Sequence, residues 1–192
     1  MNKAVLLKVT FVILSLLGLI SCFQVRPVEP PGIVSSDWVS PSDYEILLDN
    51  LQRSVSNTNV QNYLRCFSGD SLQFTPAAPL FTDNEPIWLA WSIQDEQAYF
   101  DNMVANLAVS SGNSLVLRET ELQNVDADSL TYVGNYTLRI NHQDTTLTTL
   151  FKGQIQLLIK LNTFNEWEIA RWQDIELFQD SSWSQLKLSF VQ

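Results

Sequence analysis

Hydrophobic residues recur at helical spacing in the first half of the chain and at alternate positions in the second half. The spacing after position 43 predicts an amphipathic helix over about 43–55, whose buried side consists of Tyr44, Leu47, Leu48, Leu51 and Val55. Ser42 and Glu45 have the spacing of a capping box at its start. Val60 to Phe67 predicts a second, shorter helix, and Ser71 to Thr75 a short strand that ends at Pro76.

A third helix is expected after an aromatic stretch and a polar loop. Ser92 followed by Asp95 and Glu96 places acids at the positive end of the helix dipole. The buried stripe of this helix consists of Phe100, Met103, Val104 and Leu107.

The second half predicts long antiparallel strands. Alternating apolar residues indicate a strand from Leu115, one over 130–140, a very long one over 147–161 and a last one over 167–177. Gly134 and Gly153 interrupt two of them and suggest a bulge or bend. Helices followed by an antiparallel meander predict an α+β fold.

The last strand also suggests an interface. On an extended chain, Trp167 and Ile169 point to one side and Ala170 and Trp172 to the other, so both sheet faces are expected to be apolar. An apolar outer face left in solvent is a liability, so this face invites a partner sheet, and a homodimer through it is one candidate.

The N-terminus has the pattern of a targeting segment. Lys3 and Lys8 precede an apolar run of about twelve residues, which is too short to span a bilayer. Leu19-Ile20-Ser21-Cys22 resembles the bacterial lipoprotein box. This resemblance implies cleavage between Ser21 and Cys22, with a diacylglyceryl thioether on Cys22 and an acylated new N-terminus. An ordinary signal peptide with a chance cysteine, or a simple anchoring helix, remains the alternative.

These features divide the chain into three parts and predict its localisation in the cell. Residues 1–21 are interpreted as a lipoprotein signal peptide, 22–41 as a Pro-rich tether and 42–192 as one domain. Two or more acyl chains anchor a protein stably to a membrane. Phe23 is not an acidic retention signal, so we expect a lipid-anchored protein of the bacterial cell envelope, in the outer membrane facing the periplasm.

Composition excludes several classes of function. The chain has 192 residues and a formal charge of −10, which argues against nucleic acid as a partner. Removal of residues 1–21 takes away two lysines and no acid, so the charge of the mature chain becomes −12. One histidine and one further cysteine, Cys66, cannot form a zinc site, and no metal or cofactor is expected. Cys66 lies in an apolar helical context and is expected to be buried.

Three local sequences resemble the nuclear transport factor 2-like (cystatin-like) superfamily, including uncharacterised bacterial lipoproteins. They are Asn62-Tyr63-Leu64-Arg65-Cys66-Phe67, Trp167-Glu168-Ile169-Ala170-Arg171-Trp172-Gln173-Asp174, and Ser182-Trp183-Ser184-Gln185-Leu186-Lys187. The resemblance implies N-terminal helices packed in a strongly curved antiparallel sheet that forms a cone. The resemblance implies that ketosteroid isomerase-like and dehydratase-like members work inside the mouth of the cone, with a carboxylate or histidine base and tyrosine or aspartate donors.

Aromatic residues provide the candidate site. An apolar ligand pocket at the cone mouth could be lined by Trp88, Trp91, Tyr99, Phe100, Tyr132 and Tyr136, although the same residues are also suited to core packing. Enzymatic proton transfer would use these tyrosines with His142 and a carboxylate such as Asp101. No catalytic motif is present, and the turn composition around His142 predicts an exposed loop.

The sequence therefore favours a non-enzymatic, membrane-anchored binding domain for a small apolar ligand or an envelope protein partner. An isomerase- or dehydratase-type enzyme and a structural subunit of an envelope complex are the alternatives. An open pocket that holds a buried carboxylate beside a tyrosine would favour the enzyme.

Overall fold

A computed structural model describes residues 37–109, 111–178 and 181–191. The expected signal peptide (1–21), the cleavage site at Ser21 and Cys22, and most of the expected tether lie outside the described residues. The elements in chain order are α2 (Tyr44–Ser56), α3 (Val60–Leu64), a 3₁₀ turn (Gly69–Ser71), β1 (Gln73–Thr75), α4 (Ala78–Asp83), α5 (Glu85–Leu89), α6 (Ile93–Ala105), β2 (Ser114–Asp126), β3 (Ser129–Arg139), β4 (Leu150–Leu161), β5 (Trp167–Glu176) and α7 (Trp183–Phe190).

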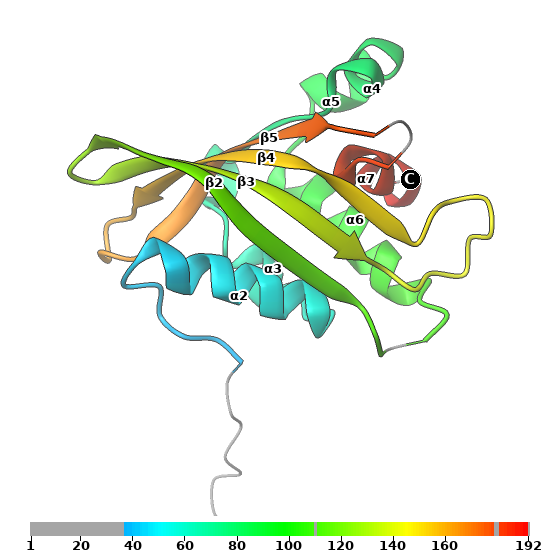
Figure 1. The fold of residues 1–192 in the computed structure, drawn as a ribbon, viewed down its shortest axis with the longest axis horizontal. Coiled ribbons are helices and arrows are strands. Elements are labelled where there is room, and N and C mark those ends of the chain that lie inside the picture. The colour runs from blue at the N-terminus through cyan, green and yellow to red at the C-terminus, as the bar shows by residue number, and fades with distance from the viewer. Residues whose placement is uncertain (1–36, 110, 179–180, 192) are drawn as a thin grey trace, which may run out of the picture. The chain divides into compact units, whose positions relative to one another are not determined.

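The five strands form one curved sheet in the order β1-β5-β4-β3-β2. All neighbouring pairs are antiparallel except β1, which runs parallel to β5 over three residues. The helices α2, α3, α6 and α7 lie against one side of this sheet, and α4 and α5 lie beyond β5 (Figure 1). The α+β class and the curved, mainly antiparallel sheet are thereby confirmed.

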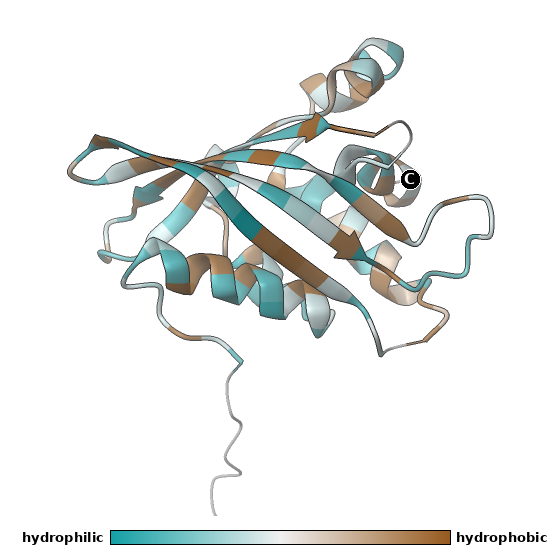
Figure 2. Cartoon of the chain, in the orientation of Figure 1, coloured by the Kyte–Doolittle hydropathy of each residue, from teal (hydrophilic) through white to brown (hydrophobic). Residues whose placement is uncertain are grey.

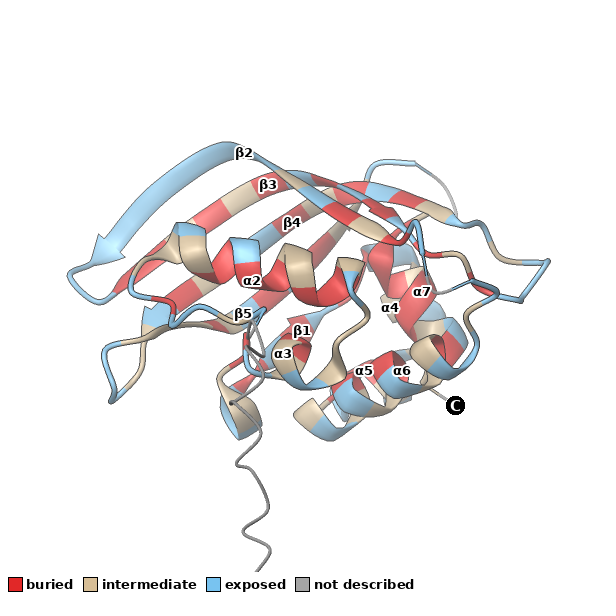
Figure 3. Cartoon of the chain, turned by 90° about the horizontal axis from the view of Figure 1, so that it is seen from below, coloured by how far each residue is buried: buried red, intermediate tan, exposed pale blue. Residues whose placement is uncertain are grey.

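Alternation of side chains places the core between the sheet and the helices. Apolar and polar residues alternate along the strands (Figure 2), and the helix faces turned toward the sheet are buried (Figure 3). On β4 the buried positions are Phe151, Gly153, Ile155, Leu157 and Ile159. The far half of β2 extends past this core and is exposed.

The 13-residue helices α2 and α6 form where the sequence predicts them, and their start signals explain why. Ser92 and Asp95 form a reciprocal capping box at α6. The cap of α2 is one residue later than expected: the side chain of Asp43, not Ser42, accepts a hydrogen bond from the Ile46 N–H.

Among the described residues, the helices α4, α5 and α7 were not predicted. The segments that form α4 and α5 read as a loop because prolines occur near both of their starts, at positions that tolerate proline in a helix. The helix α7 begins after Ser182, whose side chain accepts a hydrogen bond from the Gln185 N–H. That capping signal is present in the sequence.

A bulge in β5 corrects the expected distribution of its side chains. The register shifts between Leu158 and Ile159 of β4, so Ala170 is an extra residue in β5. Ile169 and Trp172 are consequently both buried, not on opposite faces. The outer face of β4 is mainly polar; it consists of Lys152, Gln154, Gln156, Leu158 and Lys160. The homodimer through this face stays a prediction, but its stated basis, an apolar outer face, is wrong.

Two glycines make room for tyrosine rings beneath the curved sheet. A Cβ at Gly134 would lie 2.4 Å from the hydroxyl of Tyr132, and one at Gly153 would lie 2.5 Å from that of Tyr136. The register between β2 and β3 also shifts opposite Gly134, as the sequence suggested. The glycines therefore let both rings lie flat on the inner surface.

The last residues of the expected tether pack against the body. The side chain of the buried Asn50 hydrogen-bonds both backbone groups of Val39, and the Trp167 N–H donates to the Pro41 carbonyl at 2.9 Å. The Arg65 guanidinium lies 4.2 Å from the ring centroid of Trp38. None of the helices in the described part of the chain combines the length and apolar character required of a membrane span.

Candidate functional site

An ion pair occupies the space between the sheet and the helices. The Lys187 ammonium on α7 lies 2.5 Å from both carboxylate oxygens of Glu96 on α6, and both side chains are fully buried. The Tyr63 hydroxyl and the Trp91 indole N–H also donate to Glu96, at 2.5 and 2.8 Å. The carboxylate therefore accepts hydrogen bonds from three side chains, which compensates for its removal from water.

Aromatic rings surround the same ammonium. Ring centroids lie 3.9 Å away for Trp172, 4.0 Å for Phe74, and 5.5 Å for Trp91 and Tyr99. Such contacts attract a cation through the negative faces of the rings. Burial lowers the pKa of the Lys187 ammonium, and Glu96 opposes that shift. The aromatic box is therefore occupied by an ammonium group of the chain itself, that of Lys187.

A second polar cluster fixes the start of α7. Asp174 on β5 accepts hydrogen bonds from the backbone and hydroxyl of Ser184, at 2.6 and 2.5 Å, and from the Tyr136 hydroxyl at 2.9 Å. The Trp183 N–H donates to that same tyrosine, and the Trp183 indole N–H donates to Tyr99. These bonds hold the fully buried ring of Trp183 inside the cone.

The six aromatic residues proposed as pocket lining separate into two groups. Trp88 and Trp91 line a pocket of about 290 Å³ near Phe74 and Phe81. The other four, which are Tyr99, Phe100, Tyr132 and Tyr136, are at most 2% exposed and line neither this pocket nor the groove described below. Tyr99 and Tyr136 instead take part in the hydrogen bonds that hold Trp183.

The residues considered for proton transfer do not meet. Asp101 is exposed on α6, where Gln97 contacts it. His142 is only 5% exposed, and its Nε2 lies 2.9 Å from the Thr148 carbonyl. The expectation that His142 lies in an exposed loop is wrong, because the segment pairs with Leu107 and the ring packs beside Phe151 and Phe190.

Cys66 is buried as expected. Its thiol donates to the Asn62 carbonyl, and burial raises the pKa of the thiol. In the described residues, no group of three or more His, Cys, Asp or Glu side chains is arranged to hold a metal ion.

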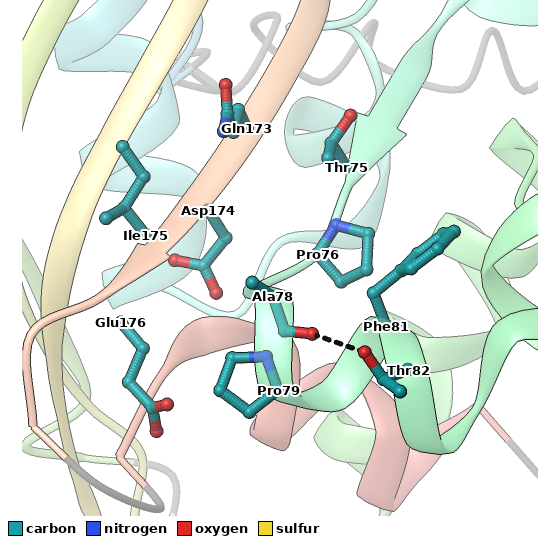
Figure 4. A pocket seen from close by; sticks show the side chains of 10 residues that line it. All are labelled: Thr75, Pro76, Ala78, Pro79, Phe81, Thr82, Gln173, Asp174, Ile175 and Glu176. Atoms are coloured by element: carbon teal, nitrogen blue, oxygen red, sulfur yellow. Dashed lines mark hydrogen bonds between the residues drawn. The ribbon is translucent and has the colours of Figure 1, made fainter.

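An open groove of about 480 Å³ lies between α4 and the end of β5. Figure 4 shows four consecutive β5 residues on one side of a gap, with the end of β1 and side chains of α4 on the other side. The β5 side consists of Gln173, Asp174, Ile175 and Glu176, and the other side of Thr75, Pro76, Ala78, Pro79, Phe81 and Thr82. The opposing wall is mostly apolar, and the charged lining residues are both acidic.

One of those acids has a perturbed pKa. Burial raises the pKa of the Asp174 carboxyl, whereas its hydrogen bonds from Ser184 and Tyr136 oppose the shift. Its side chain is 2% exposed, although it contributes to the wall of the groove. A buried carboxylate beside a tyrosine therefore adjoins an open pocket, while its oxygens also fix α7.

Sequence reasoning missed both the groove and the ion pair. The groove depends on α4, which was not predicted because its prolines are typical of a loop. It also depends on the end of β1 before Pro76. Glu96 was interpreted only as an acid in the first turn of a helix, and Lys187 was not singled out. A lysine among Trp183, Leu186 and Phe190 was the one available signal, because lysine is almost never fully buried unless it is paired.

We expect the ion pair to be strongly coupled. Lys187→Met and Glu96→Gln should each lower the free energy of unfolding by about 3–5 kcal/mol, because each leaves a buried group without its partner. The double variant should lose far less than the sum of the two. Denaturant unfolding of the four proteins measures the coupling, with Lys160→Met at an exposed β4 position as control. Additive losses would contradict this account.

Comparisons of sequence identify no relative. No protein-family model matches the chain, and no curated protein matches it in sequence.

Comparisons of structure do find similar folds. A proposed aromatic ring hydroxylase from Novosphingobium aromaticivorans has a TM-score of 0.55 at 12% identity, over 80% of this chain and 97% of the other. A ketosteroid isomerase-like protein from Erwinia carotovora atroseptica has a TM-score of 0.52 at 9% identity, over 70% and 93%. An NTF2-like protein of unknown function in nutrient uptake from Rhodospirillum rubrum has a TM-score of 0.50 at 9% identity, over 71% and 99%. The domain has a nuclear transport factor 2-like fold.

Proposed function

We propose that this protein is a non-enzymatic binding domain, held on an envelope membrane by a lipid on Cys22, that takes an apolar group into the groove between α4 and β5. One observation carries the proposal: the chain's own Trp183 and Glu96–Lys187 pair fill the interior of the cone, whereas the α4–β5 groove is open. Binding is therefore assigned to the outside of the cone.

The filled interior argues against a ligand at that position. A ligand there would have to displace Lys187 or Trp183, and each is tied to other elements by hydrogen bonds. Displacement of Lys187 would leave Glu96 as a buried charge without its ion-pair partner, at a cost of several kcal/mol.

The groove has the size and chemistry of a binding site. Its volume of about 480 Å³ lies within the range of about 300–1,000 Å³ that is typical of ligand sites. Pro76, Pro79, Phe81 and Ile175 provide apolar lining, and Thr82 and Glu176 provide polar groups at the edge. Such a combination suits an apolar group with a polar or cationic end.

The proposed membrane localisation rests on the lipoprotein box at Cys22. Acyl chains on Cys22 would hold the protein on the membrane, and a mature charge of −12 would keep the body away from anionic headgroups. We place it on the outer membrane, facing the periplasm, where the groove meets an envelope ligand or partner.

Filling the groove should remove binding. The uncharged dye N-phenyl-1-naphthylamine should fluoresce with the wild-type protein, and Ala78→Trp should reduce that signal at least fivefold because the indole occupies the groove. Ala127→Trp, in the exposed turn between β2 and β3, is the matched control and should bind as the wild type does. Equal binding by both variants would place the dye elsewhere and contradict the proposal.

The lipid anchor is tested separately. A Cys22→Ser variant expressed in a bacterial host should lose incorporation of radiolabelled palmitate and leave the membrane fraction on salt washing, because its acylated sulfur is gone. Cys66→Ser should remain labelled. Palmitate labelling of Cys22→Ser would disprove the lipoprotein assignment.

A second candidate function is proton transfer with Asp174 as the base. It is favoured by the raised pKa of Asp174, its place in the groove wall and the Tyr136 hydroxyl 2.9 Å away. The binding function is preferred because the Asp174 oxygens already accept three hydrogen bonds that fix α7.

Deuterium exchange distinguishes the two candidates. Exchange of the α-protons of cyclohexanone in D₂O, followed by NMR, should proceed equally with the wild type and with Asp174→Asn, because the carboxylate serves only to fix α7. Exchange at least tenfold faster with the wild type would favour the enzyme.

A further inference from the structure

We infer that the occupant of the α4–β5 groove is an extended, basic segment of a partner protein that pairs as a strand with the free edge of β5. This inference rests on the proposed function and names the chemistry of the partner.

The edge of β5 is only partly covered. β1 pairs with it through Gln73, Phe74 and Thr75, which lie opposite Arg171, Trp172 and Gln173. After Thr75 the chain leaves the sheet at Pro76, which has no N–H to donate, and the Ala77 N–H turns to the Ser184 hydroxyl. Within the described residues, no strand pairs with positions 174–176 on the β1 side.

The groove follows this uncovered edge. Its β5 wall is four consecutive residues, 173–176, which is the pattern expected when a cavity runs beside a strand and not across it. The helix α4 forms the opposite wall. An extended segment that continues the line of β1 therefore has one backbone edge next to β5 and lies beside α4.

Apolar residues of this chain lie at both ends of this path, where apolar side chains of the partner segment can contact them. Phe81 and Pro79 on α4 and Ile175 on β5 line the groove. Leu177 and Phe178 follow β5 directly and are 49% and 60% exposed. A strand that presents apolar residues at alternate positions would cover these surfaces, as in known cases of strand addition.

Charge selects a basic partner. The charged residues that line the groove are Asp174 and Glu176, and the adjoining helices carry the exposed Asp83 and Glu85. A second copy of the mature chain would bring a like groove and a formal charge of −12, so repulsion opposes a homodimer at this edge. Lysine or arginine flanking the apolar positions would be attracted instead.

The test uses the mature lipidated protein in neutral phosphatidylcholine nanodiscs and a fluorescent nonapeptide of alternating lysine and valine. Two further peptides carry N-methyl groups on the lysines or on the valines, because N–H groups of alternate residues point to the same edge of a strand. A fourth peptide has glutamate in place of lysine. Fluorescence anisotropy measures the dissociation constants.

We expect the parent peptide to bind, one N-methylated peptide to bind at least tenfold more weakly, and the other to bind nearly as well as the parent. The glutamate peptide should bind at least tenfold more weakly. Glu176→Lys should weaken binding at least fivefold, whereas Glu168→Lys, the same change at the other end of β5, should have little effect.

Three results would overturn the inference: no binding of the parent peptide at 1 mM, equal affinities for the two N-methylated peptides, or equal effects of the two charge reversals. If any of these occurs while Ala78→Trp still removes dye binding, the apolar groove stands and strand addition fails. If the wild-type protein binds neither the parent peptide nor the dye, the proposed function is rejected as well.

Discussion

The contact between Lys187 and Glu96 is the constraint on which the interior depends. Each side chain is fully buried, so neither charge would be tolerable without the other. The pair joins α7 to α6, and the aromatic box around the ammonium joins both helices to β1 and β5. A closed core therefore requires that α7 be docked, and the Asp174 and Tyr136 hydrogen bonds fix where that helix begins.

This arrangement is the basis of the proposed binding site outside the cone. The similar structures include a ketosteroid isomerase-like protein, yet a likeness at 9% identity concerns the fold alone. In this chain, Trp183 and Lys187 are buried in the interior, and the open α4–β5 groove lies outside the cone. The short β1 and the helix α4 line this groove, because β1 ends at Thr75, before Pro76, and leaves part of β5 uncovered.

Local signals predicted the regular elements well. The helices α2 and α6 follow from 3.6-residue periodicity and polar caps, and β3 and β4 from alternation around Gly134 and Gly153. The errors occur where one residue changes the pattern. The Ala170 bulge puts Ile169 and Trp172 on the same face, and the prolines near the starts of α4 and α5 resemble loop residues. The groove depends on such features, so it could not be predicted.

The sequence by itself determined the α+β class, the order of most elements and, as a prediction, the lipid address at Cys22, because each is encoded in neighbouring residues. Only the tertiary structure decided that Lys187 meets Glu96 from 91 positions away, that Trp183 fills the cone and that an acidic groove opens beside β5. Contacts of this kind depend on how the helices pack against the curved sheet, and local periodicity carries no information about that packing.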